Sequence, residues 1–177
     1  MMKWRLKICA KKRENWHFSD FELVDLKGVV EEVVVSEQTH AESMGLNIVI
    51  VEPDMPFPSI PGDAESLERS FLALINNAVK FSLHGGEVRI RFSVNENQAV
   101  VAIEDQGIGI IPEDMKNIFD RFWRIESFDD YLFDGVGLGL SIAKQVIEQH
   151  GGTISVKSAY GVGSEFSVKL PLSGQNR

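Results

Sequence analysis

Hydrophobic and polar positions alternate most regularly over residues 87–94, as in a strand with one buried face. That face would comprise Val88, Ile90, Phe92 and Val94. After a hairpin turn, residues 99–105 form a more fully apolar run, which predicts a second and more deeply buried strand. Similar runs predict three further strands, over residues 46–51, 153–158 and 164–170.

Three longer segments carry the 3.6-residue period of amphipathic helices, over residues 25–44, 63–82 and 138–150. Asp25 and Asp63 are the expected N-caps, and Gly45 is the stop signal of the first helix. The buried face of that helix would comprise Leu26, Val30, Val33, Ala41 and Met44. A shorter helix is expected to begin at Pro112, with Glu113 and Asp114 in its first turn, where the helix dipole favours acids. The proline-rich residues 53–62 predict a loop.

Together these elements predict a two-layer α/β sandwich of the α+β type. Its sheet would be mixed and mostly antiparallel, with about five strands, and about three main helices would cover one face. Residues 21–174 are expected to form one domain, between a basic tail or linker over residues 1–20 and a short tail over residues 175–177. A linker remnant is the favoured interpretation of the basic tail, and a contact with a membrane surface is the alternative.

Composition narrows the range of functions. The formal net charge of −8 argues against a protein that binds nucleic acid through a basic surface. Cys9 is the single cysteine, which excludes an intramolecular disulfide and fits a reducing cytoplasm. No apolar run approaches the roughly 20 residues of a spanning helix. The chain is therefore expected to be cytoplasmic, and any membrane anchor would belong to another part of a longer protein.

The predicted helix over residues 63–82 carries the first candidate chemistry. Asn77 and Lys80 lie at the edge of its apolar arc, on the same side as Ala73, whereas Asn76 points further toward solvent. A polar pair that borders a buried face is well placed to line a pocket. A capping or surface asparagine is the alternative.

The segment Asp105-Gln106-Gly107-Ile108-Gly109-Ile110 directly follows an apolar strand. Glycines two residues apart let the backbone pass close to a flat ligand. A carboxylate at the strand end accepts a hydrogen bond from the exocyclic amine of adenine, whereas guanine presents an oxygen there. A plain turn at the end of a strand is the alternative.

Two further segments contain aromatic residues, arginines and glycines. Phe119 and Phe122 are expected to pack in the core, and Arg121 and Arg124 to meet phosphates or an acidic partner. The glycine-rich residues 135–141 run into a helix, where free backbone N–H groups and the positive helix end favour an anion. A flexible hinge is the alternative for this loop.

In this order, the segments NNAVKFS, DQGIGI, IFDRFWR and GVGLGLSIAK resemble the catalytic domain of sensor histidine kinases. The closing segment IEQHGGTISVKSAYGVGSEFSVKLP also resembles that family, so the similarity covers residues 20–172. Five motifs in the same order make chance agreement negligible. The resemblance implies a Bergerat fold, shared with gyrase-like ATPases, with ATP and Mg²⁺ as cofactors.

The resemblance also implies roles for individual residues. Asn77 would bind magnesium, Lys80 would contact phosphate, Phe81 would pack near the adenine, and Asp105 would read the adenine amine. With Asn77 and Lys80, Arg121 completes the implied catalytic set. The implied nucleotide-binding residues are Asn77, Lys80, Phe81, Asp105, Gly107, Ile108, Gly109, Ile110, Gly135, Val136, Gly137, Leu138, Gly139, Leu140 and Ser164.

The phospho-accepting histidine of the family is followed by an acid, and none of the four histidines here fits. They are His17, His40, His84 and His150. The acceptor is therefore expected on a separate dimerisation domain outside this chain, with a response regulator downstream and the isolated chain monomeric. His150 matches the family's helix end and is interpreted as structural.

Two departures from the family leave alternatives open. Ala73 stands where the family usually has a second asparagine. Residues 124–137, the implied lid over ATP, contain Asp129, Asp130 and Asp134 where the family carries basic or small residues. One alternative is a weakly active or inactive, pseudokinase-like regulatory module. Another is a different Bergerat ATPase, such as an anti-sigma serine kinase or a gyrase-type enzyme, although the helix before residue 45 and the segment IFDRFWR favour histidine kinases.

Overall fold

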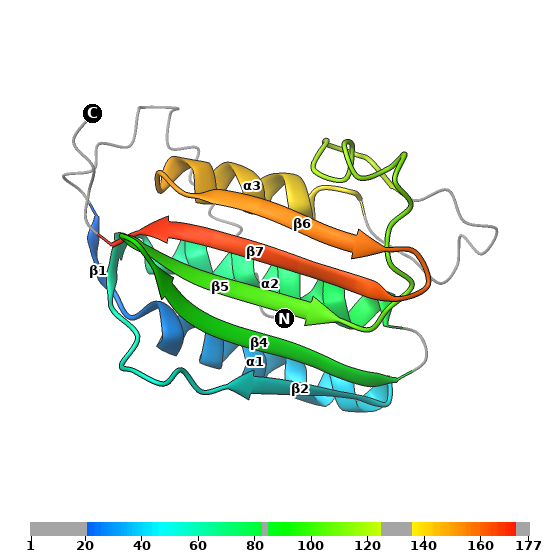
Figure 1. Cartoon of the computed structure of the whole chain (residues 1–177), viewed down its shortest axis with the longest axis horizontal. Helices are drawn as coiled ribbons and strands as arrows, with labels where there is room; N and C mark the ends of the chain where they lie inside the picture. The colour runs from blue at the N-terminus through cyan, green and yellow to red at the C-terminus, as the bar shows by residue number, and fades with distance from the viewer. Residues whose placement is uncertain (1–20, 83–84, 125–135, 173–177) are drawn as a thin grey trace, which may run out of the picture.

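The computed structural model describes residues 21–82, 85–124 and 136–172, and these form a five-stranded sheet with three helices on one face (Figure 1). The helices are α1 (Leu26–Ser43), α2 (Ala64–Phe81) and α3 (Gly139–Gln149). The strands of the sheet are β2 (Leu46–Val51), β4 (Gly86–Asn95), β5 (Gln98–Asp105), β6 (Thr153–Ala159) and β7 (Gly163–Pro171). Their order is β2-β4-β5-β7-β6, with β2 parallel to β4 and the other pairs antiparallel. The predicted two-layer sandwich is confirmed.

The predicted loop over residues 53–62 is wrong at its end. Ile60–Gly62 is strand β3, which pairs antiparallel with β1 (Glu22–Val24) in a separate two-stranded sheet. Pro61 lies opposite Leu23 in this ladder. Proline is tolerated because each strand here has only one neighbour, so a missing N–H need not interrupt pairing on both sides.

The expected short helix from Pro112 is also absent. In its place lies a series of turns over residues 112–122. The backbone N–H of Asp114 donates to the Ile111 carbonyl, and that of Asn117 donates to the Asp114 carbonyl, each closing a four-residue turn. Such tight turns take over where too few consecutive residues can propagate an α-helix.

The ends of the helices agree with those predicted from the sequence, with two exceptions. The Asp25 side chain caps α1 by accepting a hydrogen bond from the Gly28 N–H at 3.1 Å. Asp63 precedes α2 without a side-chain capping bond, and its backbone N–H donates to His150 Nε2 at 3.0 Å instead. Met44 lies beyond the end of α1 and is 43% exposed, so its expected place in the core is wrong. None of these helices is long and apolar enough to cross a membrane.

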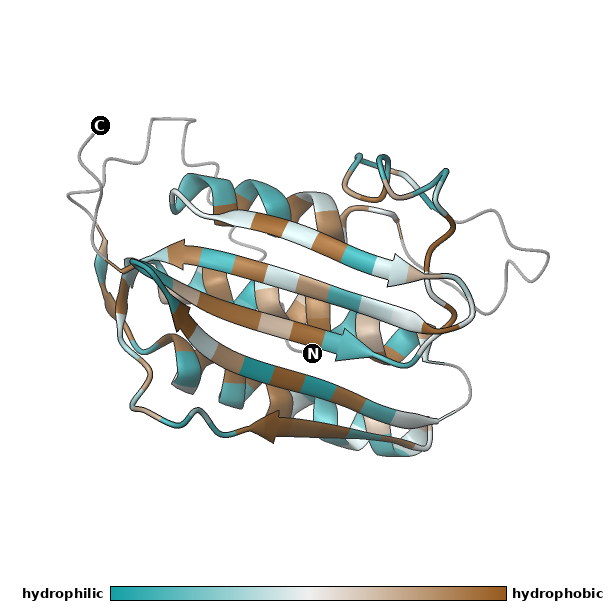
Figure 2. Cartoon of the chain, viewed as in Figure 1, coloured by the Kyte–Doolittle hydropathy of each residue, from teal (hydrophilic) through white to brown (hydrophobic). Residues whose placement is uncertain are grey.

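The core lies between the helices and the sheet, with α2 between α1 and α3. Phe71, Leu74 and Ile75 of α2 are fully buried, and Phe166 of β7 is buried opposite them. Figure 2 shows the apolar and polar residues alternating along the strands, as expected for a sheet that faces helices on one side only. Burial of each large apolar side chain stabilises the folded state by about 1.5–3 kcal/mol. Val94 departs from this pattern and is 50% exposed, because it lies next to the β4–β5 hairpin turn.

The ends of two strands and two helices converge at one end of the sandwich. The last residue of β5, Asp105, lies opposite Ser164 of β7. The C-terminal turn of α2 and the N-terminal turn of α3 reach the same end (Figure 1). Polar groups at strand and helix ends are therefore brought together where the core stops.

Candidate functional site

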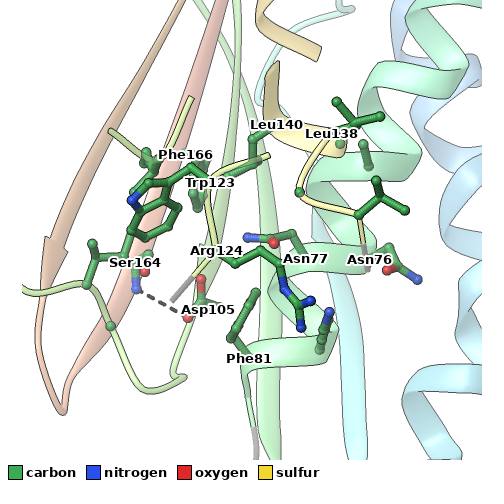
Figure 3. Close-up of a pocket in the computed structure, with 18 residues that line it drawn as sticks. Asn76, Asn77, Phe81, Asp105, Trp123, Arg124, Leu138, Leu140, Ser164 and Phe166 are labelled. Carbon is green, nitrogen blue, oxygen red and sulfur yellow. Dashed lines mark hydrogen bonds between the residues drawn. The ribbon is translucent and has the colours of Figure 1, made fainter. Parts of the chain in front are cut away.

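A cavity of about 310 Å³ opens at this end of the sandwich, between α2, the end of β5 and the start of α3 (Figure 3). Twelve of the nucleotide-binding residues implied by the family resemblance line this cavity. They are Asn77, Lys80, Phe81, Asp105, Gly109, Ile110, Val136, Gly137, Leu138, Gly139, Leu140 and Ser164. Gly107, Ile108 and Arg121 do not line it, and Gly135 lies outside the described residues.

Asp105 is the one acid among the described residues that line the cavity, and it is buried, at 6% exposure. Its Oδ1 accepts hydrogen bonds from the backbone N–H of Gly107 at 2.9 Å and of Ser164 at 3.3 Å. Within the described part of the chain, Oδ2 has no hydrogen-bond donor. Burial raises the pKa of this carboxyl from 3.8 to about 6, against the two backbone bonds, which lower it. The group is thus a poorly solvated acceptor that is ionised at neutral pH.

The two glycines after Asp105 are required by close backbone contacts. A Cβ on Gly107 would lie 2.4 Å from the Phe81 carbonyl oxygen, which also accepts a hydrogen bond from the Ile108 N–H. Gly109 has a φ of 67°, and a Cβ there would lie 2.1 Å from the Ala159 carbonyl oxygen. Gly107 and Ile108 therefore hold the loop against α2, while Gly109 and Ile110 form part of the wall.

The face of α2 that points into the cavity carries Asn77, Lys80 and Phe81. The expectation that Asn76 points toward solvent is wrong. This residue is half-buried, lines the cavity and donates a hydrogen bond to Glu37 of α1. Helical periodicity alone missed this because α1 packs against that side of α2. Ala73 also lines the cavity, and its Cβ would lie 3.6 Å from a Cβ on Gly139.

The start of α3 forms the opposite wall. Gly137 has a φ of 72°, and its carbonyl accepts a hydrogen bond from the Phe122 N–H at 2.9 Å. The N-cap residue Leu138 has no side chain that can cap the helix. The first N–H groups of α3 are therefore suited to an anion. Of the lid expected over residues 124–137, residues 125–135, which include the three acids, lie outside the described residues.

The aromatic segment divides between core, surface and cavity. Phe119 packs edge-on against Phe166, with ring centroids 6.3 Å apart. The expectation that Phe122 is also a core residue is wrong, since it is 67% exposed at a φ of 65°. This left-handed backbone turns its side chain outward while its N–H bonds to Gly137. Trp123 and Ile118 line the cavity, and their spacing in the sequence does not distinguish them from ordinary core residues.

The two arginines have different surroundings. Arg121 is exposed and donates to Gln145 Oε1 at 3.1 Å, away from the cavity. Arg124 lines the cavity (Figure 3), and Lys80 of α2 lines it as well. The implied role of Arg121 at the nucleotide thus has no support from its position, and Arg124 is the arginine placed to meet a bound anion.

This arrangement suits a flat base that carries an amine, joined to an anionic group. The base would meet the carboxylate and the aromatic residues, and the anion would meet the two cations and the start of α3. For a metal, the described residues contain no cluster of three or more His, Cys, Asp or Glu side chains. The amide oxygen of Asn77 is instead a hard ligand that fits Mg²⁺, which usually keeps water and phosphate oxygens as its other ligands.

Fold and cavity together define an α/β sandwich of the nucleotide-binding class. The chain belongs to the histidine kinase-, DNA gyrase B- and HSP90-like ATPase family, whose model matches residues 62–174. It is 33% identical over 150 residues to the sensor protein SrrB of Staphylococcus aureus, covering 85% of this chain and 25% of SrrB. The chain thus spans about a quarter of the length of this relative.

Two solved structures support the same assignment. The mycobacterial sensor histidine kinase MprB matches with a TM-score of 0.71 and 29% identity, over 85% of this chain and 97% of that one. Full-length ShkA in complex with AMPPNP matches with a TM-score of 0.75 and 29% identity, over 86% of this chain and 31% of that one. The predicted membership of the histidine kinase group is confirmed.

Proposed function

We propose that this chain is the ATP-binding catalytic domain of a two-component sensor histidine kinase. It would transfer the γ-phosphoryl group of ATP to a histidine on a separate dimerisation domain. The observation that carries this proposal is Asp105, a buried acceptor with one oxygen fixed by backbone N–H groups and the other left for a ligand amine. That acceptor matches adenine and would oppose the oxygen of guanine.

The remaining residues would position and neutralise the triphosphate. Asn77 would hold Mg²⁺, which supplies charge neutralisation at the phosphates when bound. Lys80 and Arg124 would contact phosphate oxygens, and the first N–H groups of α3 would face the same charge. Because phosphoryl transfer asks mainly for alignment and charge stabilisation, this chain needs no nucleophile of its own. The γ-phosphorus would exchange its bond to the bridging oxygen for one to the incoming histidine nitrogen, leaving ADP.

The partners and location follow from this function. The chain would work in the cytoplasm, against the histidine-containing dimerisation domain of its own full-length protein, with a response regulator receiving the phosphoryl group next. The isolated chain would be monomeric, because dimerisation would rest on that other domain. Light scattering tests this point, and a stable dimer of the isolated chain would contradict it.

The decisive experiment is calorimetric titration of ATP and GTP, with Mg²⁺ and with EDTA. ATP should bind more tightly with Mg²⁺, and GTP should bind far more weakly under both conditions. Asn77→Ala should lose the benefit of Mg²⁺, whereas Asn95→Ala, an exposed asparagine at the β4–β5 hairpin, should behave like the wild type. Absence of ATP binding with and without Mg²⁺ would refute the proposal.

One observation favours a second candidate, a regulatory nucleotide-binding module without catalysis. Ala73 lines the cavity but has no side-chain ligand. The two functions differ in transfer rather than in binding. Incubation of the full-length protein with radiolabelled ATP should produce acid-labile, base-stable label on histidine if it is a kinase. ATP binding without such label would favour the regulatory module.

A further inference from the structure

Two adjacent asparagines on α2 lie differently around the cavity. Asn77 turns toward Asp105 and Trp123, whereas Asn76 lies at the wall on the side of α1 (Figure 3). Nδ2 of Asn76 donates a hydrogen bond of 3.1 Å to Oε2 of Glu37, a residue of α1 that is 39 positions away in the sequence. A wall residue of the cavity is thus tied to a second helix.

This bond fixes which end of the Asn76 amide remains for a ligand. The Glu37 side chain is 14% exposed, and its Oε2 lies 3.3 Å from Nδ1 of His40, so this carboxylate is itself held in place. A carboxylate only accepts hydrogen bonds, so the amide must present its nitrogen to Glu37. Across residues 21–82, 85–124 and 136–172, no donor bonds to Oδ1 of Asn76. The oxygen is oriented and uncommitted.

The position one turn before Asn77 cannot supply a ligand, because it is Ala73. Its methyl group faces Gly139 across the gap between α2 and α3. On this stretch of α2, the side-chain oxygens that line the cavity are therefore those of Asn76 and Asn77. Magnesium is a hard cation that proteins usually hold through one or two oxygen ligands while it keeps water and phosphate oxygens.

We propose that Asn76, oriented by Glu37, is a second amide contact for the magnesium ion of the bound nucleotide, or for one of the waters on that ion. In this chain Asn76 would supply the second amide oxygen that Ala73 cannot supply. Glu37 is a positioning residue, since it acts through Asn76 and does not itself line the cavity. The inference rests on the proposed function, because it requires that the cavity binds magnesium and ATP.

The test is the ratio of the ATP dissociation constants in EDTA and in Mg²⁺, measured by calorimetry. Asn76→Ala and Glu37→Ala should each reduce this ratio on the order of three- to tenfold. The double variant should reduce it no further, since both changes remove the same contact. Glu37→Gln keeps an oxygen that can accept from Asn76, so it should retain most of the effect of Mg²⁺. The control is Glu42→Ala, which removes an exposed carboxylate from the same helix and should match the wild type.

Several results would overturn the inference. If both alanine variants melt at lower temperature but keep the ratio within twofold of the wild type, the bond only joins α1 to α2. If the effects of Glu37→Ala and Asn76→Ala multiply in the double variant, Glu37 does not act through Asn76. Far-UV circular dichroism of each variant shows that it is folded. If the wild type does not bind ATP at all, the proposed function is refuted. If the wild type binds ATP with a Mg²⁺ effect that the variants keep, only this inference fails.

Discussion

Asp105→Asn is expected to move stability and ATP affinity in opposite directions. Asp105 is 6% exposed, and burial raises its pKa from 3.8 to about 6. At about 1.4 kcal/mol per pKa unit, keeping this carboxyl ionised at pH 7 costs the fold about 3 kcal/mol. Because the folded pKa is the higher one, the cost is absent below about pH 3.8 and is complete once the pH exceeds about 6.

An asparagine would remove that cost while keeping the local bonds. Its Oδ1 still accepts from the N–H groups of Gly107 and Ser164. The free energy of unfolding at pH 7 should therefore rise by about 1–3 kcal/mol, which raises the melting temperature by about 3–10 °C. In the proposed complex, the other end of the side chain would be a donor facing the adenine amine. Loss of a hydrogen bond to a charged group, about 1.5–3 kcal/mol, should weaken ATP binding by about 10- to 150-fold.

Thermal melts and calorimetric titration at pH 7 measure both effects. The control is Glu104→Gln, which neutralises the adjacent acid on the outer face of β5, where Glu104 pairs with Arg91 at 2.5 Å. It should keep ATP affinity within twofold and lose at most about 1 kcal/mol of stability. The reasoning is refuted if Asp105→Asn melts at or below the wild-type temperature at pH 7, or if it binds ATP as tightly as the wild type.

Three other predictions follow from the same geometry. ATP affinity of the wild type should fall as the pH drops through about 6, where Asp105 gains its proton, and Asp105→Asn should lack this step in calorimetry. Gly109→Ala should lower the unfolding free energy by more than about 3 kcal/mol, because backbone strain and a backbone clash combine there. Gly161 has a φ of 77° with open space around it, so Gly161→Ala should lower the unfolding free energy by only about 1 kcal/mol. Equal melting temperatures of the two variants would contradict this. Burial lowers the pKa of His150 below 6.5, so stability that is present above pH 6.5 should be lost as the pH falls below that value. Chemical denaturation of Asp105→Asn with and without His150→Phe isolates the contribution of the histidine. A loss of stability below pH 6.5 that persists without the histidine would rule this contribution out.

The elements with a clear hydrophobic period were predictable from the sequence. The long helices and the main strands lie within one or two residues of their expected bounds, because local periodicity and helix stop signals suffice to place them. The short strands β1 and β3 were not predicted. A three-residue ladder that contains Pro61 has no periodic pattern of its own, and it forms only because distant segments meet.

The site was predictable where backbone constraints left a mark on the sequence. Glycines 107 and 109 could be found because only glycine fits so close to another backbone. The orientation of Trp123, Phe122 and Asn76 could not be found in this way. It depends on a left-handed turn and on the packing of α1 against α2, and neither has a signature in residue spacing.

The end of the cavity that contains Asp105 is held together mainly by hydrogen bonds of the main chain. Ile108 donates its N–H to the Phe81 carbonyl, Gly161 donates its N–H to the Ile108 carbonyl at 2.7 Å, and Ser164 donates its N–H to Asp105. Exposed side chains at the same rim, such as Tyr160 and Val162, take no part in these bonds. Over evolutionary time such positions would be free to change identity without disturbing the proposed recognition of adenine. Under the proposed function, a lineage of duplicated genes would diversify the outer surface of this rim while every copy inherited the same adenine contact.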